Sequence, residues 1–169
     1  PDTLDALLRA LYQAGVWLDH NRYQAVSMLA DYLPVGSRVL APALLGHNDY
    51  RPDGGDASEP DLLVFHRYLA NFPWVSHGYW FLNQMSRWGW LPGDQDLSAV
   101  AAACYRPDLY RWALADTPLP GQAWKGEGIH AGPWRLATSQ GEIEMGADTF
   151  IDGEAWRLRS MHFLHQSAP

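Results

Sequence analysis

The sequence is short of cysteine, of lysine and of long apolar runs. Cys104 is its one cysteine, so the chain cannot form an internal disulfide and its fold does not depend on oxidation. Charged or polar residues interrupt every apolar stretch before it reaches the roughly 18 residues that a membrane-spanning helix needs. Lysine and arginine total 12 against 19 aspartates and glutamates, and the net charge of −7 is unfavourable for wrapping nucleic acid. We therefore expect a chain that neither spans a membrane nor binds nucleic acid directly.

Lysine is the scarcest charged residue, because Lys125 is the only lysine among the 12 cationic residues. Such a bias is more typical of codon composition than of function, although arginine is the better bidentate partner for an anion. Pro1 leads directly into a helical pattern, without an initiator methionine or the apolar stretch of a secretion signal. We therefore expect a processed or excised piece of a longer protein.

Apolar and aromatic residues are abundant, at 47% and 13% of the chain, and they suffice to build a core. Apolar residues recur at helical spacing, between capping residues, glycines or prolines, over 4–18, 22–32, 37–45, 60–70, 77–88, 96–104 and 107–115. Glycine, aspartate and proline predict a surface loop over 47–58, and brief β-like runs predict strands at 134–138 and 142–145. We expect a single region, residues 1–169, that is mainly α with short β segments and has an irregular tail over 117–169.

The helix expected over 77–88 carries the most aromatic surface. Ser76 is placed to cap its first turn, and Gly89 is placed to end it. Its aromatic residues, among them Trp80 and Trp88, point around most of the helix circumference. A helix that is apolar on nearly all sides is buried on several of them, so we expect Trp88 to be a core residue.

The sequence carries no signature of catalysis or of cofactor binding. It lacks the G-x-S-x-G nucleophile turn and both glycine-rich phosphate loops. Cys104 lies in the string AAAC, which is typical of small core packing rather than of a reactive thiol. His162 and His165 have the i, i+3 spacing of two metal ligands, but no third ligand stands at a suitable spacing, which favours a solvated tail. We therefore expect no enzyme activity, no catalytic residue, no metal and no cofactor.

Four side chains near the middle of the chain are candidates for binding an anion. Trp80, Gln84 and Arg87 fall at i, i+4 and i+7, so an indole N–H, a carboxamide and a guanidinium share one helix face. Donors without a competing carboxylate can replace the water shell of a small oxyanion such as nitrate. His77 begins the same helix, next to the corner at Pro73. The alternative is structural: Arg87 pairs with an acid or a carbonyl, His77 bonds a backbone carbonyl, and the aromatic rings form a core.

Five blocks of the sequence, in the same order, resemble one protein family. They are ALLRALYQAGVWLDHNRYQAVSMLA at 6–30, PALLG at 42–46, FHRYLANFPWVSHGYWFLNQMSRWGWLP at 65–92, YRPDLYRWA at 105–113 and MGADTFIDGEAW at 145–156. Together they resemble the nitrate/bicarbonate group of ABC-transporter substrate-binding proteins, including its cytoplasmic nitrate/nitrite sensor branch. The chain departs from the family pattern at 154–157, where Glu-Ala-Trp-Arg replaces a Phe-Asp-Pro-like string.

The resemblance implies that the chain is the C-terminal portion of a two-lobed α/β, periplasmic-binding-protein-like (type II) fold. A small anion would lie in the cleft, and most pocket residues would lie upstream of Pro1. An uptake receptor, periplasmic or membrane-anchored, would hand nitrate, nitrite or bicarbonate to an ABC permease. A cytoplasmic sensor would hold a regulatory protein of nitrate assimilation until the anion arrives. The string MGADTFIDG slightly favours the sensor.

A function of another class also fits the composition. A helical protein-interaction module would use a tryptophan-rich binding surface and would catalyse nothing. It predicts a contiguous exposed apolar patch larger than a few hundred Å².

Overall fold

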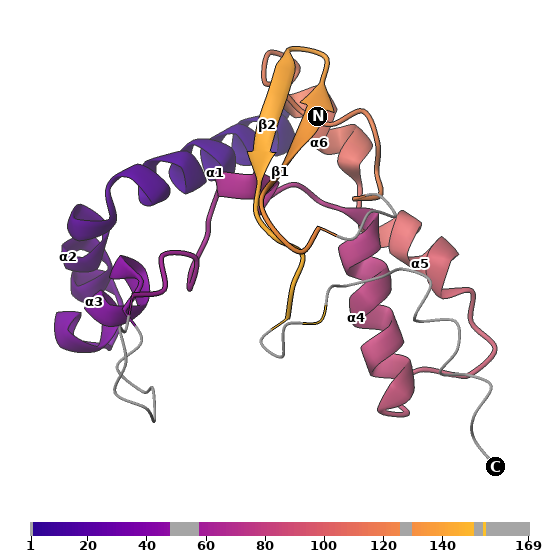
Figure 1. Ribbon diagram of the computed structural model, residues 1–169, viewed down its shortest axis with the longest axis horizontal. Helices are drawn as coiled ribbons and strands as arrows, with labels where there is room; N and C mark the ends of the chain where they lie inside the picture. The colour runs from indigo at the N-terminus through magenta and orange to yellow at the C-terminus, as the bar shows by residue number, and fades with distance from the viewer. Residues whose placement is uncertain (1, 48–57, 126–129, 151–153, 155–169) are drawn as a thin grey trace. The chain divides into compact units, whose positions relative to one another are not determined.

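The computed structural model describes residues 2–47, 58–125, 130–150 and 154 (Figure 1). Its elements follow the chain as α1 Asp2–His20, α2 Arg22–Tyr32, α3 Ser37–Leu45, the 3₁₀ turn η1 Arg67–Leu69, α4 Val75–Arg87, α5 Leu97–Cys104, α6 Pro107–Ala113, β1 Trp134–Thr138 and β2 Gly141–Met145. The two strands form an antiparallel hairpin. The described part of the chain is therefore mainly α with short β segments, as the sequence predicts.

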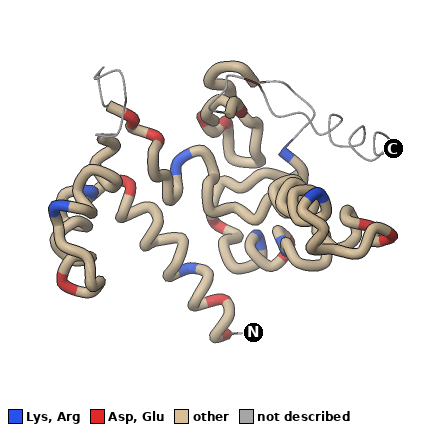
Figure 2. The backbone as a smooth tube through the Cα atoms, turned by 90° about the horizontal axis from the view of Figure 1, so that it is seen from below, with Lys and Arg blue, Asp and Glu red and all other residues tan. Residues whose placement is uncertain are grey.

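The chain divides into two compact units. The N-terminal unit is Arg9–Asn71, and the C-terminal unit is Pro1–Leu8 together with Phe72–Pro169. No described helix is both long and apolar enough to cross a membrane. Residues of both charge signs are scattered along the described backbone, with long uncharged stretches between them, so no described element forms a basic stripe (Figure 2). The single region expected over residues 1–169 stays a prediction.

In the N-terminal unit, α2 packs against α3. α1 approaches a later segment closely at Gly15, where an added Cβ would lie 3.1 Å from the Phe65 carbonyl oxygen. Gly46 ends α3 in the left-handed conformation, with a φ of +75°. The structure thus confirms the three helices that the sequence predicts before residue 47.

The helix predicted over 60–70 is wrong, because among these residues the structure has only the short turn η1. Tyr68 and Leu69 have φ values of +58° and +54°, which a right-handed helix cannot contain. The apolar spacing over 60–70 marks a compact turn rather than a helix, and Leu69 in that turn is buried. The segment turns instead of forming a helix because a carboxylate from α1 binds its backbone amides.

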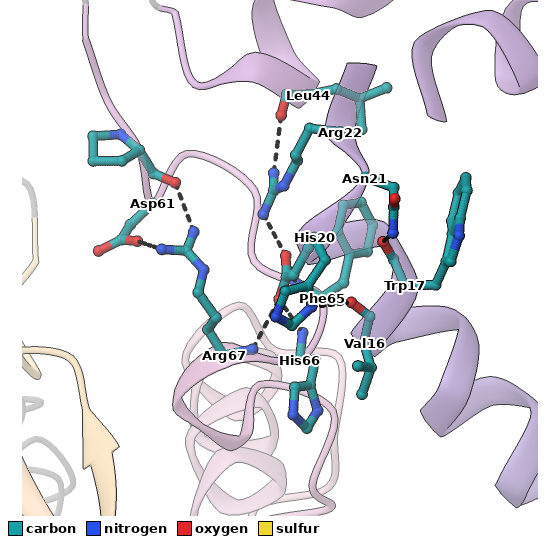
Figure 3. A network of polar contacts seen from close by, with 12 residues as sticks. Val16, Trp17, His20, Asn21, Arg22, Leu44, Asp61, Phe65, His66 and Arg67 are labelled. Atoms are coloured by element: carbon teal, nitrogen blue, oxygen red, sulfur yellow. Dashed lines mark hydrogen bonds and ion pairs between the residues drawn. The ribbon is translucent and has the colours of Figure 1, made fainter. Parts of the chain in front are cut away.

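Asp19, near the end of α1, takes the backbone N–H groups that a helix would have used (Figure 3). The amides of Phe65, His66 and Arg67 donate to its two oxygens at 3.2, 2.7 and 2.8 Å. The guanidinium of Arg22 forms an ion pair with the same carboxylate. Burial alone would raise the pKa of Asp19, but the three amides and Arg22 outweigh burial and hold the pKa below its ordinary value.

In the C-terminal unit, α4 packs against α5 around the buried side chains Val75, Tyr79 and Ala101. The two helices approach so closely that a Cβ at Gly78 would lie 2.4 Å from the ring of Tyr105. The N-terminal turns of α4 are therefore fixed in the core of this unit.

The exposure of α4 changes along its length, which corrects two predictions. Trp88 is 58% exposed and is not a core residue, because the buried residues of α4 all lie in its first turns. Ser76 does not cap the helix, because α4 begins at Val75 and places Ser76 inside the first turn. Its buried hydroxyl instead accepts a hydrogen bond from the backbone N–H of Lys125 at 3.2 Å.

The two short helices that follow α4 agree with the predicted ranges. Asp96 caps α5, with its carboxylate accepting from the amides of Ser98 and Ala99 at 3.0 Å each. Cys104, however, is exposed rather than packed in the core. It is the last residue of α5, a helix in which Ala101 is the buried position.

Candidate functional site

A pocket of about 280 Å³ opens in the C-terminal unit beside α4. Its lining comes from α4, from the segment after α6 and from the segment after β2, and it consists of His77, Trp80, Phe81, Lys125, Asp148, Thr149 and Phe150. The three α4 residues fall at i, i+3 and i+4, so one helix face forms a wall of the pocket. The other walls come from residues distant in sequence.

Two hydrogen bonds bring Lys125 to this wall. The backbone N–H of Val75 donates to the Ala123 carbonyl oxygen at 2.9 Å, and the N–H of Lys125 donates to the hydroxyl of Ser76. Together they fasten the segment 123–125 to the first turn of α4. The side chain of Lys125, only 15% exposed, is thereby held at the pocket.

Asp148 neutralises this cation. One carboxylate oxygen forms an ion pair with the ammonium of Lys125, and the other lies 2.8 Å from Nδ1 of His130. The backbone N–H of Asp148 also donates to the His130 carbonyl oxygen at 2.8 Å. The ring of His130 is stacked on Trp134 of β1, with centroids 3.7 Å apart. The carboxylate is therefore held on one side by the hairpin and on the other by Lys125.

His77 is neutral at physiological pH. Burial, followed by the positive charge of Lys125, lowers its pKa to about 4, and the charge of Asp148 offsets only part of this effect. Trp80 and Phe150 stand nearly parallel, with an interplanar angle of 28° and centroids 6.2 Å apart. The described lining thus combines aromatic walls, a neutral imidazole and an ion pair between an ammonium and a carboxylate.

This arrangement can bind a small molecule. The ammonium of Lys125, which is paired with Asp148, is a group that can donate charge-assisted hydrogen bonds to a bound anion. The described residues contain no group of three or more His, Cys, Asp or Glu that could hold a metal ion. His162 and His165, the pair with metal-like spacing, lie outside the described residues.

The structure brings together two of the four residues predicted to bind an anion. His77 and Trp80 line the pocket. Gln84 and Arg87 do not line it: Arg87, which is exposed, donates from Nη1 to Oε1 of Gln84 at 2.7 Å. The guanidinium therefore binds its own neighbour on the helix rather than pointing at the pocket wall.

Sequence reasoning missed Lys125 and Asp148, the two charged residues of the described pocket lining. Lys125 carries a signal as the only lysine of the chain, but such a bias is more typical of codon composition than of function. Asp148 stands in the string MGADTF, which contributed only to the family resemblance. Their pairing depends on contacts between segments 23 residues apart, which no local pattern shows.

Comparison with known proteins gives three informative similarities, although no protein-family model matches the chain. The chain is 34% identical over 118 residues to the nitrate/nitrite binding protein NrtA of Synechococcus elongatus, covering 67% of this chain and 26% of NrtA. It is 29% identical over 117 residues to the nitrate import ATP-binding protein NrtC of Synechocystis, covering 65% of this chain and 17% of NrtC. It resembles the crystal structure of the periplasmic nitrate-binding protein NrtA from Synechocystis with a TM-score of 0.70 and 21% identity, covering 98% of this chain and 40% of that one.

The structural similarity extends over nearly the whole chain and shows that it has part of the periplasmic-binding-protein fold. The chain spans about a quarter of the length of the curated NrtA relative. The sequence similarity and the fold agree with the family that the five sequence blocks indicate. The chain belongs to the nitrate-binding family of ABC-transporter substrate-binding proteins.

Proposed function

We propose that the chain takes part in binding nitrate or nitrite within an ABC uptake receptor. The observation that carries this proposal is the 34% identity to a nitrate/nitrite binding protein over two thirds of the chain. The relatives' names specify nitrate and nitrite rather than bicarbonate, which favours these anions. The solved relative is named as periplasmic, which favours an exported receptor over a cytoplasmic sensor.

The partners of such a receptor are the membrane and ATP-binding components of a nitrate import system. The similarity to NrtC supports this assignment, because a nitrate import ATP-binding protein carries a related segment. The receptor itself binds and releases its anion without chemical change, so it is not an enzyme.

The pocket beside α4 is the anion site that we propose, with Lys125 as the principal contact. Nitrate is a planar, weakly hydrated anion. Contact between its faces and an aromatic ring such as that of Trp80 therefore costs little hydration energy. The ammonium of Lys125 supplies charge-assisted hydrogen bonds to its oxygens. His77, neutral and with a ring N–H, is placed to donate a further hydrogen bond.

Anion titration of the purified protein, by calorimetry and by thermal melting, tests this assignment. We expect nitrate and nitrite to raise the melting temperature in proportion to ln(1 + [L]/Kd), and chloride at equal ionic strength to leave it unchanged. Lys125→Gln should abolish the shift, while Arg87→Gln, a matched loss of one cation outside the pocket, should preserve it.

Two results would contradict the assignment. If neither nitrate nor nitrite shifts the melting temperature at millimolar concentrations, the chain does not bind these anions. If Arg87→Gln and Gln84→Ala remove the response while Lys125→Gln keeps it, the anion lies on the exposed end of α4 instead.

One observation supports the interaction module as a second candidate. Trp88 and Trp90 are both exposed at the end of α4, with ring centroids 4.9 Å apart. Exposed aromatic pairs are typical of protein-binding surfaces. This candidate would gain support if no anion shifts the melting temperature and if a Trp88→Ala, Trp90→Ala double variant abolishes self-association measured by sedimentation.

A further inference from the structure

The pocket contains a carboxylate that competes with any anion that enters it. Among the described residues that line the pocket, Lys125 is the only lysine or arginine, and its ammonium is already paired with the Asp148 carboxylate. A carboxylate and nitrate both present planar, delocalised oxygens to a donor. They therefore compete for the same N–H groups.

Asp148 does not depend on Lys125 alone for its position. Its second oxygen lies 2.8 Å from Nδ1 of His130, and its backbone N–H donates to the His130 carbonyl oxygen. His130 is in turn fixed by stacking on Trp134. If the flexible Lys125 side chain turned toward a ligand, the carboxylate would still be held by the hairpin side of the pocket.

The charge balance makes this competition costly for the ligand. The described lining of the pocket holds one ammonium and one carboxylate, while His77 on α4 is neutral. A bound monoanion leaves two negative groups facing one positive group in a site where Asp148 is only 9% exposed. Water screens such repulsion poorly at buried sites.

We propose that Asp148 sets the affinity of the site by occupying Lys125 until an oxyanion takes its place. This inference rests on the proposed function, because it concerns the same anion and the same ammonium. Asp148 is then a positioning residue. Its ion pair with Lys125 prevents anions from binding when their concentration is low. His130 is the residue that retains Asp148 after the exchange.

Asp148→Asn tests the competition with little change of shape. The variant removes the negative charge but keeps an oxygen for the His130 contact, so nitrate should bind about tenfold more tightly or better. Glu142→Gln is the matched control, because it removes the same charge at an exposed ion pair with Arg135 on the hairpin. Its nitrate affinity should equal that of the unaltered protein.

The single lysine provides a second readout that needs no substitution. In the 169-residue chain, labelling with 13Cε-lysine gives one side-chain resonance, that of Lys125. Nitrate should shift this resonance as Asp148 is exchanged for the ligand, and the same shift should appear at lower nitrate concentration in Asp148→Asn. Chloride at equal ionic strength should leave it in place.

The outcomes separate the two proposals. If nitrate binds and moves the lysine resonance, but Asp148→Asn binds no more tightly than Glu142→Gln, the competition is refuted and the anion site stands. If nitrate binds without moving the resonance, Lys125 is not the contact and the exchange is refuted. If nitrate does not bind at all, the proposed function fails and the inference fails with it. Should Asp148→Asn not fold, the resonance of the unaltered protein still decides whether the exchange occurs.

Discussion

The two units each bury an aspartate, and the two carboxylates are held in opposite ways. Asp19 in the N-terminal unit has a side chain 1% exposed and accepts from three backbone amides as well as from Arg22. Asp148 in the C-terminal unit is 9% exposed, and its carboxylate is held by two side chains, Lys125 and His130, beside an open pocket. The Asp19 carboxylate is therefore held by the backbone of its own unit, while the Asp148 carboxylate is held by side chains that can move.

The difference lies in what the donors can do. Backbone amides cannot leave a carboxylate unless the turn that carries them unfolds. An ammonium at the end of four methylenes can rotate to a new acceptor at small cost. A carboxylate held by amides is thus part of the fold, while one held by side chains can take part in binding.

The largest expected effect on stability comes from replacing Asp19. Asp19→Ala leaves three amides and the Arg22 guanidinium without their acceptor, so we expect a loss of about 3 to 5 kcal/mol in the free energy of unfolding. Urea denaturation measures this loss. Asp31→Ala, on the exposed face of α2, should change the free energy by less than about 0.5 kcal/mol. A loss below about 1 kcal/mol for Asp19→Ala would mean that the carboxylate does not organise the turn.

A smaller effect separates His77 from Asp19 by pH. Folding lowers the pKa of His77 from 6.5 to about 4, so the unfolded chain binds more protons between these values and stability falls as the pH falls from 6.5 to about 4. The loss is on the order of 2 to 3 kcal/mol, at 1.36 kcal/mol per pKa unit. His77→Gln should reduce this slope in urea denaturation series at several pH values, and the slope that remains is expected from His66, whose pKa burial also lowers.

Asp19 acts in a different window. Its folded pKa lies below 3.8, so its stabilisation is complete above that value and is lost only as the pH falls through the lowered pKa. Asp19→Ala should therefore keep the slope between pH 6.5 and about 4 that His77 produces. If both substitutions remove the same slope, the two groups do not titrate independently.

Local signals predict most of the helices. Asp96 caps α5 and Gly46 ends α3, and both work through atoms within four residues of themselves. The hairpin likewise follows from short β-like runs at 134–138 and 142–145. These elements could be predicted because the physics that forms them is confined to a few neighbouring residues.

Long-range partners explain what the sequence could not show. The segment 60–70 has helical spacing, but Asp19, more than 40 residues earlier, takes its amides. The pocket likewise depends on Lys125 and Asp148, which reach α4 through contacts far along the chain. The predicted face of α4 supplied two pocket residues, because helix spacing fixes which side chains share a side but not what packs against it.

The smallest effect is expected for Trp88, at the C-terminal end of α4, and Trp74, at the other end, serves as its reference. Trp74, which precedes the helix, is completely buried, so Trp74→Ala should lower the free energy of unfolding by about 3 to 5 kcal/mol. Trp88→Ala, at the other end, should lower the free energy of unfolding by less than about 1 kcal/mol, since the Trp88 ring is largely in solvent. Urea denaturation of both variants under one condition gives the comparison. Equal losses would show that the far end of α4 is covered in solution, and the exposed tryptophan pair would then be part of a packed interface rather than a free surface.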